Sequence, residues 1–273
     1  MTGGRRLIVN ADDFGFSRDV NRGIVEACQD GILTAATLMA NGAAFDDAVA
    51  LARANPSLDV GCHLVLVSGP SVAHPGRGLP AKVSGLLAAL ARGRIDPEQE
   101  MDAQIRRILA AGIQPSHLDT HKHTHLLPTV LEAVARLARR HSIPWVRRPF
   151  DAPAAAASAG APWKARIISR GLWFLRGRFD RVLARHGARA TDHFAGFQLT
   201  GRYDANRLAA LIRQLPPGVT EFMCHPGRCS EELRGAATRL KESREAELAA
   251  LTDELVRRAL IESGVALASF RDL

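Results

Sequence analysis

Short apolar runs alternate along the chain with longer stretches in which apolar residues recur at helical spacing. The first run, Arg6–Asn10, predicts a buried strand, and Ser17 is placed to cap a helix that ends near Gln29. The same alternation continues to the C-terminus. Further strands are expected at 35–40, 60–67, 116–120, 144–147, 194–199, 220–224 and 266–270, and further helices at 45–54, 97–111, 128–141, 164–186, 205–215 and 241–263.

Alternation of this kind, repeated seven or eight times, predicts parallel strands joined by right-handed crossovers. In 273 residues it fits an α/β fold, an irregular TIM-like (β/α) barrel of 7–8 parallel strands that forms a single domain over 1–273. The competing fold is a doubly wound open sheet, which the absence of a G-x-G-x-x-G turn after the first strand disfavours. Within the domain, 152–190 is expected to hold a small-residue linker and an inserted basic amphipathic helix, which could be broken at Gly171 or Gly177.

Polar residues follow the ends of many of the predicted strands. Asp12 and Asp13 follow the first strand and Asn41 follows the second, while His63 and His225 lie near the ends of two later strands. In a parallel barrel these ends meet on one face, where barrel active sites are built. Because core packing would favour apolar residues at such positions, the pattern predicts a reactive site on this face.

The segment from His117 to His125 carries the strongest single chemical signal. Every second position holds a histidine or an aspartate, so an extended backbone would point all five side chains the same way: His117, Asp119, His121, His123 and His125. Such a cluster is costly to bury unless something binds it. Since neutral imidazole is the commonest metal ligand, the segment predicts a metal site, and the alternative is a polar loop with incidental histidines.

The other candidates also have structural alternatives. The Asp12–Asp13 pair could cap the next helix, although Ser17 already supplies a cap, and His63 could be a packed core histidine. Cys224 and Cys229 flank His225 and could form a structural zinc site. A C-x4-C pair without a second cysteine pair is a weak signal, so we expect passive cysteines and an active-site His225.

The composition is ordinary apart from one basic region. Hydrophobic residues make up 47% and charged residues 23% of the chain, as in soluble globular proteins, and no apolar run could span a bilayer. The apolar run that follows Arg5–Arg6 is too short for a signal-peptide core, so a cytoplasmic location is expected. Between Lys164 and Arg189 lie eight basic residues and one acid, which is +7 of the net +8.

This basic segment has three interpretations. It could be a solvated helix packed on the barrel, with an inward face of Trp163, Ile167, Ile168, Leu172, Phe174 and Leu175. It could instead lie on an anionic membrane surface at the periphery of the inner membrane, with its apolar contact made by Trp163, Trp173, Phe174 and Phe179. Nucleic-acid binding is the third, and no nucleic-acid partner is expected because no such motif is visible.

Missing motifs narrow the chemistry further. The chain lacks a G-x-S-x-G elbow and a G-x-x-x-x-G-K-[ST] loop, which counts against a serine hydrolase and a P-loop NTPase. A metal-dependent hydrolase, acting on an amide, an ester or a phosphoester, remains the leading class. The competitor is a basic membrane-surface or lipid-binding protein with a non-catalytic barrel.

Five stretches of the sequence resemble the YdjC-like carbohydrate deacetylase family, which includes chitooligosaccharide deacetylases. They are 9–15, 60–65, 117–125, 223–227 and 269–273, and they span almost the whole chain in the family's order. Three shorter segments, 121–125, 144–149 and 192–194, are most similar to the branch associated with hopanoid biosynthesis. That branch is thought to deacetylate a lipid-linked amino sugar.

The resemblance implies a divalent metal ion, magnesium or zinc, and hydrolysis of the N-acetyl group of an amino sugar on a hopanoid lipid or a chitooligosaccharide. By position, Asp13, His63 and His121 match the metal ligands, Asp12 matches the catalytic base, and His225 falls where a late active-site histidine is expected. Imidazole ligands suit zinc, nickel or cobalt better than magnesium.

The remaining candidates are taken as substrate-binding residues. His123 and His125 match motif positions without an individual role, and Asn41 follows a strand end. Arg148 is expected to orient the sugar or Asp12. In the expected mechanism Asp12 takes a proton from a metal-polarised water, and His225 gives one to the departing amine.

Overall fold

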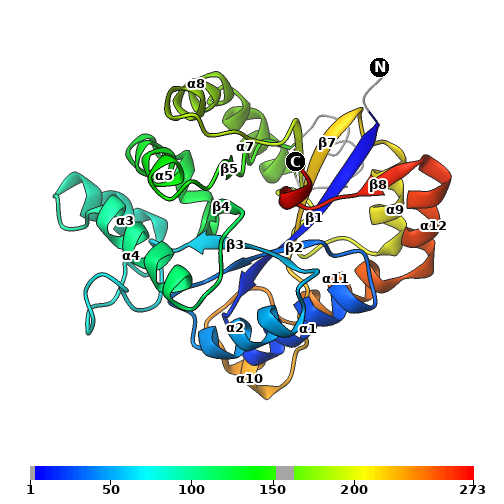
Figure 1. The fold of residues 1–273 in the computed structure, drawn as a ribbon, viewed down its shortest axis with the longest axis horizontal. Coiled ribbons are helices and arrows are strands. Elements are labelled where there is room, and N and C mark those ends of the chain that lie inside the picture. The colour runs from blue at the N-terminus through cyan, green and yellow to red at the C-terminus, as the bar shows by residue number, and fades with distance from the viewer. Residues whose placement is uncertain (1–3, 152–162) are drawn as a thin grey trace.

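Eight parallel strands form one curled sheet at the centre of the molecule (Figure 1). The computed structural model describes residues 4–151 and 163–273. The strands are β1 (Arg5–Phe14), β2 (Ala35–Leu38), β3 (Asp59–Leu64), β4 (His117–Thr120), β5 (Trp145–Val146), β6 (His193–Ala195), β7 (Gly218–Cys224) and β8 (Val265–Leu267). Their order is β5-β4-β3-β2-β1-β7-β6, and β8 pairs with the beginning of β1. The expected barrel-like α/β fold is confirmed.

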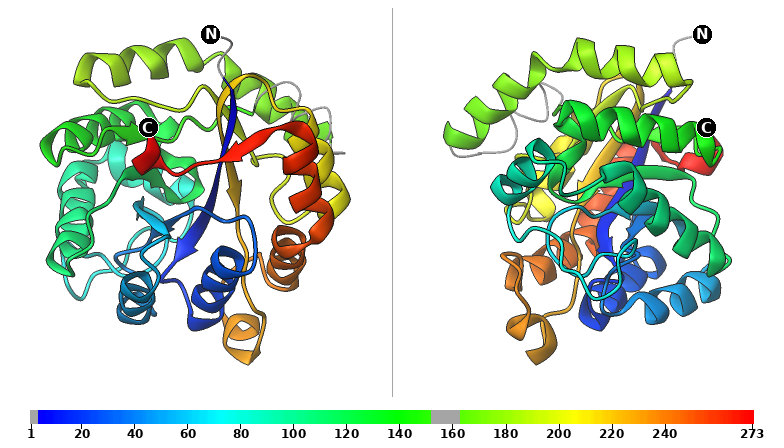
Figure 2. Two further views of the ribbon diagram at one scale, coloured as in Figure 1. Left: turned by 45° about the vertical axis from the view of Figure 1, so that its right-hand side comes forward. Right: turned by 90° about the vertical axis from the view of Figure 1, so that its left-hand side faces the viewer.

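Helices surround this sheet on its outer side (Figure 2). They are α1 (Arg18–Gln29), α2 (Phe45–Ala54), α3 (Val83–Ala91), α4 (Pro97–Ala110), α5 (Pro128–Arg140), α7 (Trp163–Trp173), α8 (Arg176–His186), α9 (Ala205–Arg213), α10 (Glu231–Gly235), α11 (Glu242–Thr252) and α12 (Glu254–Ser263). Two 3-10 turns, η1 (His121–Leu126) and η2 (Phe270–Asp272), complete the described elements. An isolated bridge between Asp151 and Phe194 links the regions of β5 and β6, the two edges of the sheet.

Local sequence signals account for most element boundaries. The Ser17 side chain accepts a hydrogen bond from the Val20 N–H and so caps α1, as expected. Asp96 caps α4 in the same way, and Pro97 occupies the first turn, where its missing N–H costs nothing. β1 is buried from Leu7 to Phe14 because helices cover the outer face of the sheet and side chains fill its inner face.

Some elements differ from the prediction. α3 was not expected, and the helix expected over 241–263 is two helices, because Asp253 leaves the helical conformation and caps α12 through the Leu255 N–H. The basic helix expected over 164–186, with a possible break at Gly171 or Gly177, is divided between these two glycines, since α7 ends at Trp173 and α8 begins at Arg176. The small-residue linker expected at 152–162 lies outside the described residues.

The first interpretation of the basic segment, an inward apolar face, holds at Leu172, which packs against the core, and is wrong at other positions. The membrane interpretation is wrong at Phe179, which is buried. Trp163, Ile167 and Phe174 are 67%, 60% and 88% exposed, whereas Phe179 of α8 is buried.

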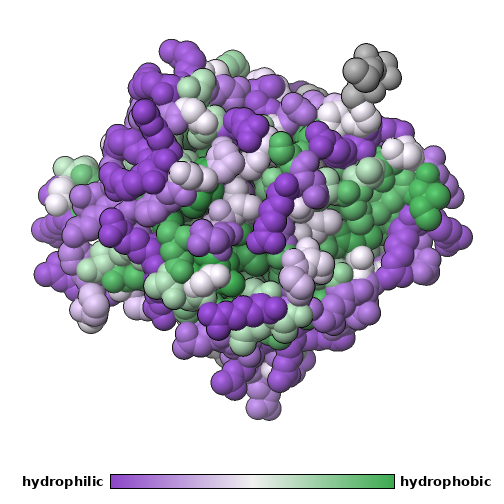
Figure 3. Space-filling view, in the orientation of Figure 1, coloured by the Kyte–Doolittle hydropathy of each residue, from purple (hydrophilic) through white to green (hydrophobic). Residues whose placement is uncertain are grey.

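Ile261 of α12 and Leu267 of β8 are also exposed apolar side chains. Figure 3 shows a hydrophobic area on the side of the molecule where α12 and β8 lie. Among the described residues, no helix is both long and apolar enough to cross a membrane.

Candidate metal centre and active site

A turn at the end of β1 places two adjacent carboxylates inside the barrel. The pairing of β1 with β2 shifts register between Ala11 and Phe14, and Asp13 has a left-handed φ of 68°. Aspartate tolerates this conformation better than most residues. Asp12 and Asp13 are both buried, and α1 is capped by Ser17, so the alternative that this pair caps the helix does not hold.

A second turn follows β4. The backbone leaves the extended conformation after Thr120, and Lys122 and His123 have φ values of 56° and 51°. The prediction of one extended segment as far as His125 is therefore wrong. Alternation places His117 and Asp119 in the barrel interior, while η1 presents His121 at its mouth, where the side chain is half-buried.

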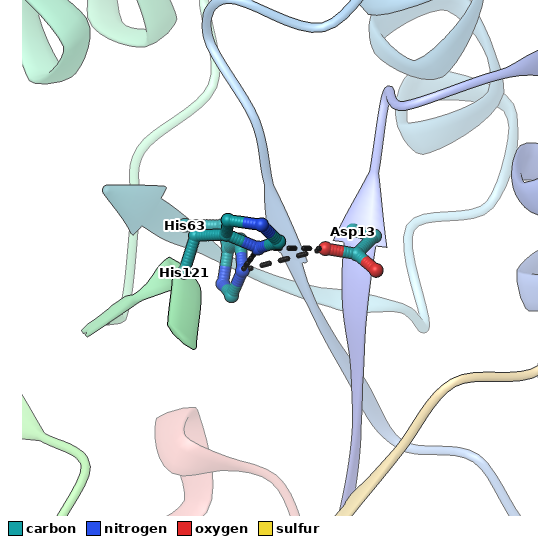
Figure 4. A group of neighbouring side chains, drawn as sticks. All are labelled: Asp13, His63 and His121. Atoms are coloured by element: carbon teal, nitrogen blue, oxygen red, sulfur yellow. Dashed lines mark hydrogen bonds and ion pairs between the residues drawn. The ribbon is translucent and has the colours of Figure 1, made fainter. Parts of the chain in front are cut away.

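Three side chains converge at this mouth from β1, β3 and η1 (Figure 4). Asp13 Oδ1 lies 3.5 Å from His63 Nε2 and 3.3 Å from His121 Nδ1, and these two nitrogens are 3.4 Å apart. Asp13 Oδ1 is buried without a hydrogen-bond partner. An orphaned carboxylate oxygen facing two imidazole nitrogens fits a divalent cation, and three protein ligands would leave positions open for water and substrate.

Asp119 holds the His63 ring in the orientation that a metal ligand needs. His63 Nδ1 donates to Asp119 Oδ1 over 2.7 Å, while Thr37 Oγ1 donates to Asp119 Oδ2 over 3.2 Å. The lone pair of Nε2 is thereby directed to the cation site. Burial opposes a charged ring, but the Asp119 carboxylate prevails and raises the pKa of His63 to about 9. A cation on Nε2 therefore competes with a proton.

Arg147, on the segment that follows β5, fixes the second carboxylate of the pair. Its Nη2 and Nη1 donate to Asp12 Oδ1 and Oδ2 over 2.7 and 2.8 Å. Nη1 also lies 2.5 Å from Asp119 Oδ2, and Nε donates to Glu221 over 2.7 Å. A second group of close potential ligand atoms comprises Asp12, His63 and Asp119. Between the carboxylates of Asp12 and Asp119, however, the Arg147 guanidinium already supplies the positive charge. Burial raises the pKa of Asp12 although Arg147 opposes it.

The pKa of Asp13 is shifted in the opposite direction from that of Asp12. Burial would raise the pKa of Asp13, but Arg244 and His121 outweigh it and hold that pKa well below the ordinary value. Arg244 Nη2 donates to Asp13 Oδ2 over 2.5 Å. Asp13 is therefore an anion suited to a cation, while its neighbour Asp12 is a carboxylate more ready to take up a proton.

His225, at the end of β7, lies beside Asp12. Its Nε2 is 3.8 Å from Asp12 Oδ2, and its Nδ1 is 3.9 Å from Glu247 Oε2. Glu247 accepts a hydrogen bond from the His225 N–H over 2.5 Å and so fixes the backbone at this position. Burial lowers the pKa of His225 to about 4, and the ring is neutral.

The two later histidines of the motif do not belong to the ligand triad; His125 is buried and His123 is half-buried. His125 Nδ1 lies 2.5 Å from Thr120 Oγ1, and its Nε2 lies 3.0 Å from the Arg147 carbonyl, so both ring nitrogens have protein partners. The His123 ring contacts the rings of Phe194 and Phe197, and its Nδ1 has no partner. Their role in substrate binding stays a prediction.

The last two candidates contact loops. Asn41 Nδ2 donates to the Pro70 carbonyl over 3.1 Å. Arg148 pairs with Asp180 at 3.3 Å and donates to the Thr191 carbonyl. The expectation that Arg148 orients Asp12 is wrong, because both Asp12 oxygens accept from Arg147, whereas the Arg148 guanidinium contacts Asp180 and the Thr191 carbonyl. A role of Arg148 toward the sugar stays a prediction.

Four buried charged residues lie at this site: Asp119, Arg147, Arg244 and Glu247. Sequence reasoning included Asp119 only as a member of the predicted metal-binding segment and gave no role to the other three. Asp119 and Arg147 stand at predicted strand ends, so their position was a usable signal. Arg244 and Glu247 lie on α11, far along the chain, within an ordinary charged helical pattern. Nothing in the local sequence separates them from solvated residues.

Comparisons with known proteins show the family and the fold of this chain. A family model described as YdjC-like protein matches residues 6–262. A carbohydrate deacetylase of Geobacillus stearothermophilus is 34% identical over 275 residues, covering 98% of each chain. A chitooligosaccharide deacetylase of Klebsiella pneumoniae strain 342 is 33% identical, covering 98% of this chain and 99% of the relative. A crystal structure from Enterococcus faecalis V583 shares the fold, with a TM-score of 0.74, 24% identity and 98% coverage of both chains.

Proposed function

Because the chain belongs to the YdjC-like family, we propose that it is a metal-dependent deacetylase that hydrolyses the N-acetyl group of an amino sugar. The observation that carries the proposal is the convergence of Asp13, His63 and His121 within 4.8 Å of one another, beside a separate buried carboxylate, Asp12. The named relatives are carbohydrate and chitooligosaccharide deacetylases, which supports an acetylated carbohydrate as the substrate class.

Two imidazoles and one carboxylate oxygen would hold the ion. This donor set favours zinc or a similar transition metal over magnesium, which prefers oxygen ligands and keeps several waters. When bound, such an ion polarises the acetamide carbonyl and lowers the pKa of a coordinated water. His63 and His121 come from separate elements, so the fold and not the local sequence sets the ligand geometry.

Asp12 serves as the general base. Burial raises the pKa of its carboxyl, which suits a group that takes up the proton of the attacking water. Arg147 holds both carboxylate oxygens, so the base is fixed in one orientation before substrate arrives. A fixed base loses little conformational freedom in the transition state.

His225 then delivers a proton to the leaving nitrogen. Its ring is neutral at rest, and its Nε2 lies 3.8 Å from Asp12 Oδ2. The proton that Asp12 removes from water passes to His225 and from there to the amine as the C–N bond breaks. Acetate and the free amino sugar leave, and both residues return to their starting protonation states.

Acetate release from N-acetylglucosamine oligomers tests the proposal. Protein purified without added metal should contain about one ion per chain by elemental analysis, and chelation should abolish turnover until zinc is restored. Asp12→Asn should lower turnover at least ~100-fold, the usual contribution of a general base, with metal content near that of the wild type. Asp46→Asn on the exposed surface of α2 is the matched control.

Two outcomes would contradict this assignment. Full activity of Asp12→Asn rejects the base, and full activity of metal-free protein rejects the metal. A metal-dependent esterase or phosphoesterase would use the same centre, so acetate esters and phosphate esters belong in the same assay. Faster turnover of either would transfer the proposal to that class.

A lipid-linked form of the amino sugar, including a hopanoid lipid, is the narrower substrate that we propose. The observation in favour is the exposure of Trp163 and Ile167 on α7, and of Phe174 directly after it, in the most basic part of the chain. Exposed aromatic and aliphatic side chains among arginines are typical of helices that lie on anionic lipid surfaces. The barrel would then work at the periphery of the inner membrane, and its intact ligand set argues against a purely lipid-binding role.

A further inference from the structure

The two oxygens of Asp13 have different surroundings. Oδ2 accepts a hydrogen bond from Arg244 Nη2, whereas Oδ1 has no donor and faces His63 and His121. We propose that Arg244 is a positioning residue that restricts Asp13 to one-oxygen coordination of the metal and ties this ligand to the turn that carries His225. The inference rests on the proposed metal centre and adds a residue that acts through Asp13.

The Arg244 side chain lies in the interior of the protein, where it contacts Asp13. It projects from α11, 231 residues beyond Asp13, and its side chain is 1% exposed. A guanidinium in such a place is strongly destabilising unless a carboxylate matches it. Asp13 is the carboxylate with which it forms an ion pair, and its Nε donates to the Leu240 carbonyl over 3.3 Å. Removal of either partner would leave a buried charge.

The backbone of Arg244 supports the neighbouring turn. The Gly227 N–H donates to the Arg244 carbonyl over 3.2 Å, and a Cβ on Gly227 would lie 3.1 Å from Arg244 Cδ. On the other side, a Cβ on Gly23 of α1 would come within 2.4 Å of Gly227 Cα. The turn is therefore held between α1 and α11, two residues after His225. One residue thus fixes both the metal ligand and the turn beyond the proposed proton donor.

The contact between Arg244 and Asp13 Oδ2 limits how many oxygens Asp13 can offer to a metal ion. A carboxylate binds a divalent ion through one or two oxygens, and a second oxygen would occupy a position that water or substrate needs. With Oδ2 held by Arg244, only Oδ1 of Asp13 remains free for the ion. The positive charge of Arg244 by itself repels a cation. A purely electrostatic role therefore predicts tighter metal binding when Arg244 is removed, and a positioning role predicts weaker binding.

Zinc affinity of the full-length protein distinguishes these roles. Arg244→Gln should weaken zinc binding about 10- to 100-fold in competition with a chromophoric chelator, the usual effect of losing a residue that orients a ligand. Arg244→Lys keeps the positive charge but loses the planar guanidinium group. Its zinc affinity should lie between those of Arg244→Gln and the wild type. Arg258→Gln removes the same charge from the exposed surface of α12 and should bind zinc as the wild type does.

A structure of zinc-loaded wild-type protein gives an answer that does not depend on whether the variants fold. Asp13 bound through one oxygen, with Arg244 on the other, supports the proposal. Two-oxygen binding by Asp13, or unchanged or tighter zinc binding by a folded Arg244 variant, overturns it. Failure of the wild type to bind zinc or another divalent ion would instead reject the proposed function.

Discussion

Asp12 and Asp13 are adjacent in the sequence, yet their carboxylates lie in different environments. Arg244 pairs with Asp13 and, against the effect of burial, holds its pKa low, while burial outweighs Arg147 and raises the pKa of Asp12. Environments that separate the pKa values of two neighbouring acids assign them different tasks. The ligand and the base of the proposed mechanism therefore come from one dipeptide, and their difference lies in their partners.

His117 shows how a histidine of the same motif takes a structural role. Its Nε2 lies 3.0 Å from the Asn10 amide nitrogen, which can only donate, so this ring nitrogen carries no proton. The ring also stacks on Phe270 with 3.9 Å between the centroids. Burial lowers the pKa of His117 to about 4. Its neutral ring belongs to the packed interior and not to the cation site.

We expect His117→Gln to make stability less sensitive to acid. Unfolded histidine binds a proton near pH 6.5 and folded His117 binds one only near pH 4, so wild-type stability is complete above pH 6.5 and is lost as pH falls. Between pH 7 and 4.5 the wild type should lose about 2 kcal/mol more than the variant. Urea denaturation at both pH values measures this difference, and equal losses would contradict it.

At the level of elements, the junction of β3 and β4 determines which histidines reach the barrel mouth. β3 carries Gly61 beside the His117 ring, and a Cβ there would lie 2.5 Å from an atom of that ring. The absent side chain makes room for the inward-facing imidazole. After Thr120 the left-handed residues of η1 then bring His121, rather than the later histidines, to Asp13 and His63.

Gly61→Ala should therefore destabilise the fold. The added methyl group would overpack the space between β3 and the His117 ring, and overpacking costs about 1–3 kcal/mol. Gly171→Ala is the matched control, since a Cβ at that position in α7 meets nothing within 4 Å. Thermal or urea denaturation compares the two variants. Equal stability of both would show that the contact at Gly61 is relieved by movement of the ring.

At the scale of the whole molecule, two features far apart in sequence serve one proposed function. The strand ends gather the ligands at the barrel mouth, and α7 presents apolar side chains to solvent. Eight basic residues lie between Lys164 and Arg189, in the same part of the chain as that apolar surface. An amphipathic lipid substrate would be drawn from a membrane by such a surface and hydrolysed in the barrel.

Vesicle co-sedimentation at low salt measures whether this surface binds membranes. The wild type should bind phosphatidylglycerol vesicles and not phosphatidylcholine vesicles, and Phe174→Asp should weaken binding about tenfold, because it removes one large apolar side chain from the contact. Ile261→Asp, at an exposed apolar position of α12, is the matched control. Absence of wild-type binding, or equal losses in both variants, would contradict the membrane proposal.

The sequence by itself determined the order of the elements and the face on which the chemistry lies. Strand and helix periods are local properties, and the C-terminal ends of parallel strands meet whatever the loops between them contain. For that reason Asp12, Asp13 and His63 could be placed together before any coordinates. Short caps, such as Ser17, likewise fixed boundaries without reference to distant residues.

Only the tertiary structure decided which charged groups pair inside the barrel. Arg147 contacts Asp12 across 135 residues and Arg244 contacts Asp13 across 231, and no local pattern encodes partners at such separations. The exposure of α7 could not be predicted either, because helical periodicity does not show which face of a helix packs against a neighbour. The turn at η1 could not be predicted because an alternating pattern does not show where a strand ends. Burial of a charge is settled by the whole fold, since its free energy depends on every group that surrounds it.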